Sequence, residues 1–186
     1  MKKTVFLLMF AAALSLSACS NDNNSNSSSN QMSSNNMQME HGSHSSSGEV
    51  PNNLRVAENP TYKVGSEAII QSDHMEGMKG ATATIVGAYD TTAYTVSYRP
   101  TSGGAPVTNH KWIIHEEIKD AKDISYRPGA EVVMEADHME GMKGATAQIT
   151  SAEKTTVYMV DYKPTTGGDE VKNHKWVTED ELSPVK

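Results

Sequence analysis

The stretch ATATIVGAYDTTAYTVSY, residues 81–98, carries the clearest structural signal in this sequence. Its first part, residues 81–86, is rich in threonine and β-branched residues, which favour strands. In its last part, residues 92–98, the side chains of Tyr94, Val96 and Tyr98 alternate with others and would share one face of a strand. We therefore expect two strands here, over residues 81–86 and 92–98.

The same pattern occurs twice in the chain. Residues 63–118 align without a gap to residues 127–182, at an offset of 64 and with 30 identities in 56 positions. In the first copy, further strands are expected over 67–71 and 109–114, and a final turn over 116–118. Two copies are too few for a solenoid, so each copy is expected to be a small domain. A domain of this size has little core, and packing between the copies is expected to help stabilise both.

The glycines of each copy suggest a fold type. Gly65, Gly77 and Gly80 of the first copy are spaced in a way that is similar to the start of KOW-type and other SH3-like barrels. The resemblance implies two tandem SH3-like β-barrels, over residues 57–121 and 122–186. It concerns the fold alone, because such barrels serve many functions.

An eleven-residue loop sequence, DHMEGMKGATA, occurs unchanged in both copies. Thioether and imidazole donors together favour Cu(I), because soft ligands select soft ions. The alternative is structural, with the second methionine of each loop filling the core. The candidate ligands are His74, Met75 and Met78 in the first copy and His138, Met139 and Met142 in the second.

A second repeated motif, Asn-His-Lys-Trp, lies in the last expected strand of each copy. His110 and Trp112 are two residues apart and would share a face, as would His174 and Trp176. If this strand passes near the loop, His110 and His174 complete a set of His and Met ligands. Alternatively, these histidines bond to backbone groups. We expect both tryptophans in the core, since aromatic residues dominate small cores.

The N-terminus has the pattern of a lipoprotein signal peptide over residues 1–18. Lys2 and Lys3 precede an apolar run that is too short to span a membrane and ends in Leu-Ser-Ala-Cys. This end is similar to a lipobox, which implies a diacylglycerol on Cys19 and anchoring to the cell membrane. Residues 19–56 are expected to be a disordered tether. The tether adds weaker candidate metal ligands at Met37, Met39, His41 and His44.

Composition excludes several functions. The 186-residue chain has a formal net charge of −7, which argues against nucleic-acid binding. Cys19 is the only cysteine, so neither a disulfide within the chain nor a multi-thiolate metal site is possible. Because no nucleophile is accompanied by a positioned base, we expect no enzymatic activity. We also expect a monomer.

The lipobox, the tether and the doubled HMEGMKGA…NHKW unit together resemble the YdhK-type lipoproteins of Gram-positive bacteria. The same features of this chain are also similar to those of the copper-binding surface lipoproteins often called CopL. This resemblance covers nearly the whole chain and implies copper sequestration at the extracellular face of the membrane, beside copper-exporting ATPases. It assigns no ligands. The alternative is a cell-wall or peptide-binding module of the SH3-like class, which predicts an exposed aromatic groove.

Overall fold

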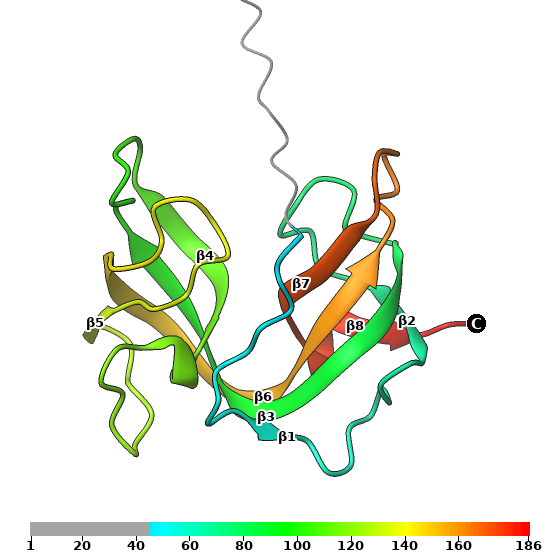
Figure 1. Cartoon of the computed structure of the whole chain (residues 1–186), viewed down its shortest axis with the longest axis horizontal. Coiled ribbons are helices and arrows are strands. Elements are labelled where there is room, and N and C mark those ends of the chain that lie inside the picture. Colours follow the sequence, from blue (N-terminus) through cyan, green and yellow to red (C-terminus); the bar gives the residue numbers. More distant parts are fainter. Residues whose placement is uncertain (1–44) are drawn as a thin grey trace, which may run out of the picture. The chain divides into compact units, whose positions relative to one another are not determined.

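The computed structural model describes residues 45–186, which form an all-β structure (Figure 1). The predicted signal peptide, Cys19 and the tether ligands lie outside the described residues. In residues 45–186 no helix is long and apolar enough to cross a membrane. The elements are β1 Arg55–Val56, β2 Glu67–Ile70, β3 Thr82–Tyr98, β4 Val107–Ile114, η1 His115–Glu117, β5 Glu131–Val133, β6 Thr146–Tyr162, β7 Val171–Thr178, η2 Glu179–Glu181 and β8 Leu182–Pro184.

Residues 82–98 form a single 17-residue strand, β3. The prediction of two separate strands is therefore wrong in this region. Its partner β6 is equally long and pairs with β3 from Ala83↔Tyr162 to Tyr98↔Ala147. Register shifts at Ile85/Gly87 and Thr95/Val96 interrupt the ladder only locally. Residues 87–91, in the middle of β3, pair with residues 155–159 of β6. This pairing keeps the polar residues among them in the strand.

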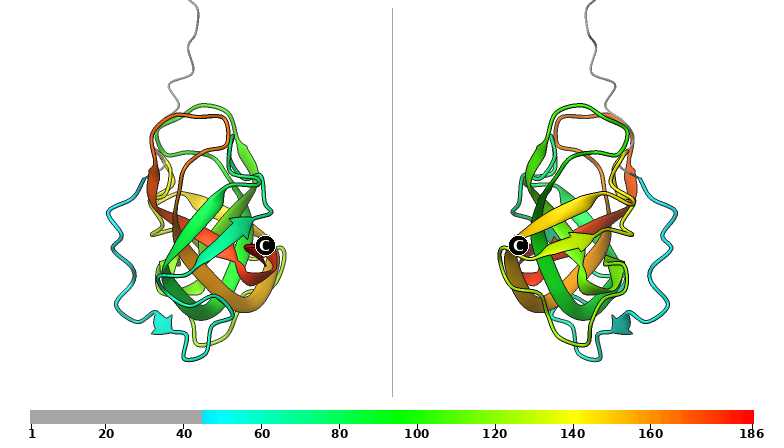
Figure 2. Two further views of the ribbon diagram at one scale, coloured as in Figure 1. Left: turned by 90° about the vertical axis from the view of Figure 1, so that its right-hand side faces the viewer. Right: turned by 90° about the vertical axis from the view of Figure 1, so that its left-hand side faces the viewer.

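The two repeats exchange their halves, so the prediction of two separate barrels is wrong. All eight strands belong to one antiparallel sheet. The first lobe contains the first half of β3 and the second half of β6, together with β2, β7 and β8. The second lobe contains the other halves of β3 and β6, with β4 and β5. Figure 1 shows β3 and β6 side by side, both curving from one lobe into the other, and each view of Figure 2 faces one lobe.

Each lobe has a core built from both repeats. In the first lobe, Ile70, Met78 and Ile85 pack with Tyr158 and Val160. In the second lobe, the equivalent residues of the other repeat pack with Tyr94 and Val96. A unit of about 60 residues buries only about 60% of its surface, and sharing strands lets each repeat bury its apolar face against the other.

A third cluster of buried residues joins the lobes and contains Trp112 and Trp176, which are buried as predicted. Val50 packs against this cluster and Leu54 belongs to it. The predicted tether boundary at residue 56 is therefore wrong, since residues 45–56 contact the folded part. β1 confirms this, because Arg55 and Val56 pair with β3.

Candidate copper site

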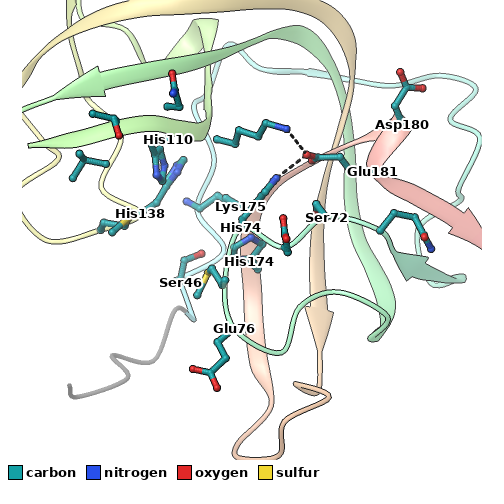
Figure 3. Close-up of a pocket in the computed structure, with 18 residues that line it drawn as sticks. Ser46, Ser72, His74, Glu76, His110, His138, His174, Lys175, Asp180 and Glu181 are labelled. Atoms are coloured by element: carbon teal, nitrogen blue, oxygen red, sulfur yellow. Dashed lines mark hydrogen bonds and ion pairs between the residues drawn. The ribbon is translucent and has the colours of Figure 1, made fainter. Parts of the chain in front are cut away.

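A cavity of about 760 Å³ lies where the opening loops and the closing strands of both repeats meet (Figure 3). We define the opening loops as residues 73–80 and 137–144, and the closing strands as β4 and β7. The structure brings six of the eight predicted folded-domain ligands to this cavity, namely His74, Met75, His110, His138, Met139 and His174.

The other two predicted ligands, Met78 and Met142, are fully buried in the lobe cores. A tight turn explains the division. In the first loop the backbone N–H of Met78 donates to the carbonyl of Met75 at 3.2 Å, and the second loop repeats this bond between Met142 and Met139. This turn directs the first methionine to the cavity and the second into the core. Met78 and Met142 are therefore packing residues.

Each opening loop is held by the strand-connecting loop of the other repeat. The backbone N–H of Thr165 donates to the carbonyl of Gly77, and that of Thr101 donates to Gly141, both at 2.8 Å. Gly77 has a φ of +75°, and a Cβ there would lie 2.6 Å from the hydroxyl oxygen of Thr166. Glycine is thus required at this point for both conformation and space.

A carboxylate fixes the orientation of each loop histidine. Nε2 of His74 lies 2.7 Å from Oε1 of Glu181, whose Oε2 accepts a hydrogen bond from the indole N–H of Trp112 at 2.8 Å. Burial alone would raise the pKa of Glu181, but hydrogen bonds from His74, Trp112 and the backbone of Thr178 outweigh it and hold the pKa at about 2. Glu181 is therefore a carboxylate at neutral pH.

The second lobe repeats this arrangement. Nε2 of His138 lies 2.6 Å from Oε1 of Glu117, and Trp176 donates to Oε2 of Glu117 at 3.1 Å. Sequence reasoning missed both glutamates and placed them in a final turn. Their signal was identity at equivalent positions, Glu117 and Glu181, inside a segment that otherwise differs between the repeats.

The carboxylates determine which ring nitrogen remains free for a ligand. Since a carboxylate only accepts, Nε2 of each loop histidine carries a proton, and in the neutral tautomer Nδ1 keeps its lone pair. Nδ1 of His74 and Nδ1 of His138 are buried and have no hydrogen-bond partner among the described residues. A buried polar atom without a hydrogen-bond partner lowers the stability of the fold. A metal ion bound at each Nδ1 would supply the missing partner.

The closing strands place the other two histidines against tyrosine edges. The ring of His110 lies 6.2 Å from that of Tyr98, and the ring of His174 lies 5.8 Å from that of Tyr162. Burial, with the nearby imidazoles of His138 and His74, lowers the pKa of His110 to about 4. His110 is therefore neutral at pH 7, which is the form that binds metals.

The six predicted ligands that line the cavity fall into two matching groups, which we call half-sites. We define the first half-site as His74, Met75 and His174, and the second as His138, Met139 and His110. In the view of Figure 3, His110 is drawn beside His138 and His74 beside His174, and the charges of both His138 and His74 act on His110. Each half-site draws on both repeats, because its loop and its closing strand belong to different copies. No group of three His, Cys, Asp or Glu side chains in residues 45–186 is arranged to hold a metal ion.

His115 has a structural role outside the cavity. Its Nδ1 accepts from the hydroxyl of Tyr94 at 2.9 Å, and its Nε2 donates to the carbonyl of Lys122 at 2.7 Å. Both ring nitrogens are thus satisfied by the protein. His115 therefore offers a matched control for the cavity histidines.

Comparisons with known proteins agree with the repeat and the fold. A family described as "Protein of unknown function (DUF1541)" matches residues 64–115 and 128–179. The chain is 58% identical over 182 residues to the uncharacterized protein YdhK of Bacillus subtilis, covering 98% of this chain and 89% of that protein. A crystal structure of this DUF1541 family protein from Bacillus subtilis has a TM-score of 0.74 at 67% identity, covering 76% of this chain and 96% of that chain. A solution structure of the ydhK C-terminal domain has a TM-score of 0.62 at 70% identity and covers 65% of this chain and 92% of that chain.

Proposed function

We propose that this chain, which belongs to the DUF1541 family, binds copper as Cu(I) in the cavity between its two lobes. The observation that carries the proposal is the pair of half-sites, each with two imidazoles and an accessible thioether. The unpartnered Nδ1 atoms of His74 and His138 support it further. Soft thioethers with neutral imidazoles suit Cu(I) better than Cu(II) or harder ions.

The ligand number also supports this choice. Structural zinc sites use four ligands from Cys, His and carboxylates in a tetrahedron. The described residues hold no three such side chains at one point. Two imidazoles and a thioether would instead leave a site of low coordination number built from soft and neutral donors. Neutral donors add no negative charge that would favour a divalent ion.

We propose that the protein sequesters copper outside the cytoplasm while anchored through lipid on Cys19 at the extracellular face of the membrane. The motif Leu-Ser-Ala-Cys at residues 16–19 motivates the anchor. The resemblance to CopL-type lipoproteins motivates the role in copper resistance, with a copper-exporting ATPase system as the partner. The tether ligands Met37, Met39, His41 and His44 would add copper capacity near the membrane.

The test is a Cu(I) titration against a chromophoric chelator under anaerobic conditions. Replacing His74 and His138 by Gln removes one imidazole from each half-site and should lower Cu(I) affinity at least about tenfold. His115→Gln is the matched control and should leave the affinity unchanged. If the double variant is folded by circular dichroism and binds Cu(I) as tightly as the parent, the cavity is not a copper site.

A second candidate is the binding of a cell-wall peptide, and the size of the cavity favours it. A volume of about 760 Å³ is far more than a single ion needs and lies in the range of small-molecule pockets. Titration of the metal-free protein with a muropeptide distinguishes the two functions. Saturable peptide binding that persists in the His74 and His138 double variant would favour this candidate.

A further inference from the structure

The segment just before the fold lies along only one of the two closing strands. We call residues 45–49 the strap. The backbone N–H of Ser46 donates to the carbonyl of Lys172 at 2.9 Å, and the hydroxyl of Ser46 donates to the carbonyl of Asn173 at 2.7 Å. The side-chain amide of Asn173 donates back to the carbonyl of Ser46 at 3.2 Å. These bonds hold the strap against β7, and Ser46 itself lines the cavity.

The strap makes equivalent positions of the two closing strands unequal. On β7, which carries the strap, Asn173 is half-buried and both His174 and Lys175 are buried. The corresponding positions of β4 are more open, since Asn109 and Lys111 are exposed and His110 is half-buried. The local sequence Asn-His-Lys-Trp is identical in both strands, and Asn173 and Lys175 of β7 bond to Ser46 and Glu49 of the strap.

The lysines show the same asymmetry. Nζ of Lys111 reaches Oε1 of Glu181 at 3.4 Å, next to His74. Nζ of Lys175 instead donates to the carbonyl of Glu49 in the strap at 2.7 Å. The loop methionines differ too, because Met139 is 39% exposed whereas Met75 packs against the core of the first lobe.

We propose that the two half-sites are functionally unequal, with an open one that exchanges metal rapidly and a capped one that retains it. The second half-site, His138, Met139 and His110, is the open one. The first half-site, His74, Met75 and His174, is the capped one, because the strap bonds to Asn173 and Lys175 on either side of His174. This inference rests on the proposed function, and it adds that a segment of the chain itself controls access to the first half-site.

The experiment measures how fast each ion leaves. The mature full-length chain, with Met32, Met37 and Met39 replaced by Leu and His41 and His44 replaced by Gln, is loaded with two equivalents of Cu(I). It is then mixed with excess chromophoric chelator in a stopped-flow instrument. We expect two release phases whose rates differ by about tenfold, as the opening of one or two hydrogen bonds would give. Met139→Leu should remove the fast phase, and Met75→Leu should remove the slow phase.

Loosening the strap tests its role directly. Ser46→Ala with Asn173→Gly removes two side-chain donors, and glycine tolerates the φ of 53° at residue 173. This variant should accelerate the slow phase severalfold. The matched control is Asn109→Gly alone, at the equivalent β4 position, which lies outside the strap and has a φ of 51°. The control should leave both rates unchanged.

A third variant disrupts the strap more strongly, through a steric clash with β7. Gly48 has a φ of +79°, and a Cβ there would lie 3.1 Å from Cγ of Asn173, so Gly48→Val should lift the strap. A single release phase in the parent, or a slow phase that both strap variants leave unchanged, would overturn the inference while the proposed function stands. Failure of the parent to bind Cu(I) at all would instead overturn the proposed function, and the inference with it.

Discussion

At the scale of single residues, the loop sequence His-Met-Glu-Gly-Met places its two methionines in different environments. Met75 and Met139 face the cavity, while Met78 and Met142 are in the lobe cores. Replacing Met75 and Met139 by Leu should therefore lower Cu(I) affinity at both half-sites with little loss of stability. The swap nearly conserves volume and costs less than about 1.5 kcal/mol even in a core.

The matched control is the double replacement of Met78 and Met142 by Leu, which changes the same number of thioethers in the same loops. It should keep the parent affinity in a chelator competition. Equal loss of affinity in both double variants would show that the buried thioethers also bind copper. Circular dichroism confirms that each variant is folded.

The half-buried imidazole of His110 predicts a loss of stability in acid. Burial and the neighbouring histidines lower its pKa from 6.5 to about 4 in the folded protein. Between these values the unfolded chain binds more protons at this group, so the free energy of unfolding falls as the pH drops from about 6.5 to about 4. The contribution is on the order of 3 kcal/mol. Urea unfolding at pH 7 and pH 4 should show a smaller pH-dependent loss in His110→Gln than in the parent, and an equal loss would contradict the role of His110.

At the scale of elements, the paired long strands β3 and β6 make each repeat dependent on the other. A fragment of residues 45–121 exposes half of β3 without a partner. Because the repeats are nearly equivalent, this fragment should pair β3 with β3 of a second copy and form a symmetric dimer. Sedimentation should show a dimer at high concentration and a monomer on dilution. Circular dichroism should show that the monomer is unfolded. A folded monomeric fragment would show that a repeat can close on itself.

The same equivalence explains what the sequence could predict at this scale. The alternation of Tyr94, Val96 and Tyr98 correctly predicts a strand on which these three side chains share a buried face. It does not predict which copy of the opposite strand fills the partner position, because Tyr158, Val160 and Tyr162 repeat the pattern in the other copy. Pairing within a repeat and pairing between repeats satisfy the same local preferences. In the structure β3 pairs with β6 of the other repeat along nearly its whole length.

The candidate site was predictable to a similar degree. Residue type and repetition identify the four histidines that line the cavity. The sequence could not show that Met75 lines the cavity while Met78 lies in the core. Their different directions depend on the geometry of one tight turn. Nor could it find Glu117 and Glu181, since a carboxylate in a short turn usually faces solvent. Their role depends on a contact between positions 107 residues apart for His74 and Glu181.

At the scale of the whole molecule, the sequence around Cys19 predicts that the protein is anchored to the membrane. Cys19→Ala should prevent lipidation, and the protein should leave the membrane fraction or stall during processing. Fractionation and intact mass of the mature protein measure this. If the variant partitions with membranes as fully as the parent and matures to the same mass, the anchor is not at Cys19. The cavity variants with unchanged Cys19 serve as controls and should stay in the membrane fraction.

Because the two repeats that exchange strands belong to one chain, assembly of the cavity does not depend on protein concentration. Two separate chains that met through β3 and β6 would assemble only at sufficient concentration. Here the residues between η1 and β5 join the two copies, so their encounter is intramolecular, with an effective concentration on the order of millimolar. The cavity therefore forms however sparsely the molecule is distributed over a surface. Its two half-sites are always present in a one-to-one ratio, which two freely dissociating subunits could not guarantee.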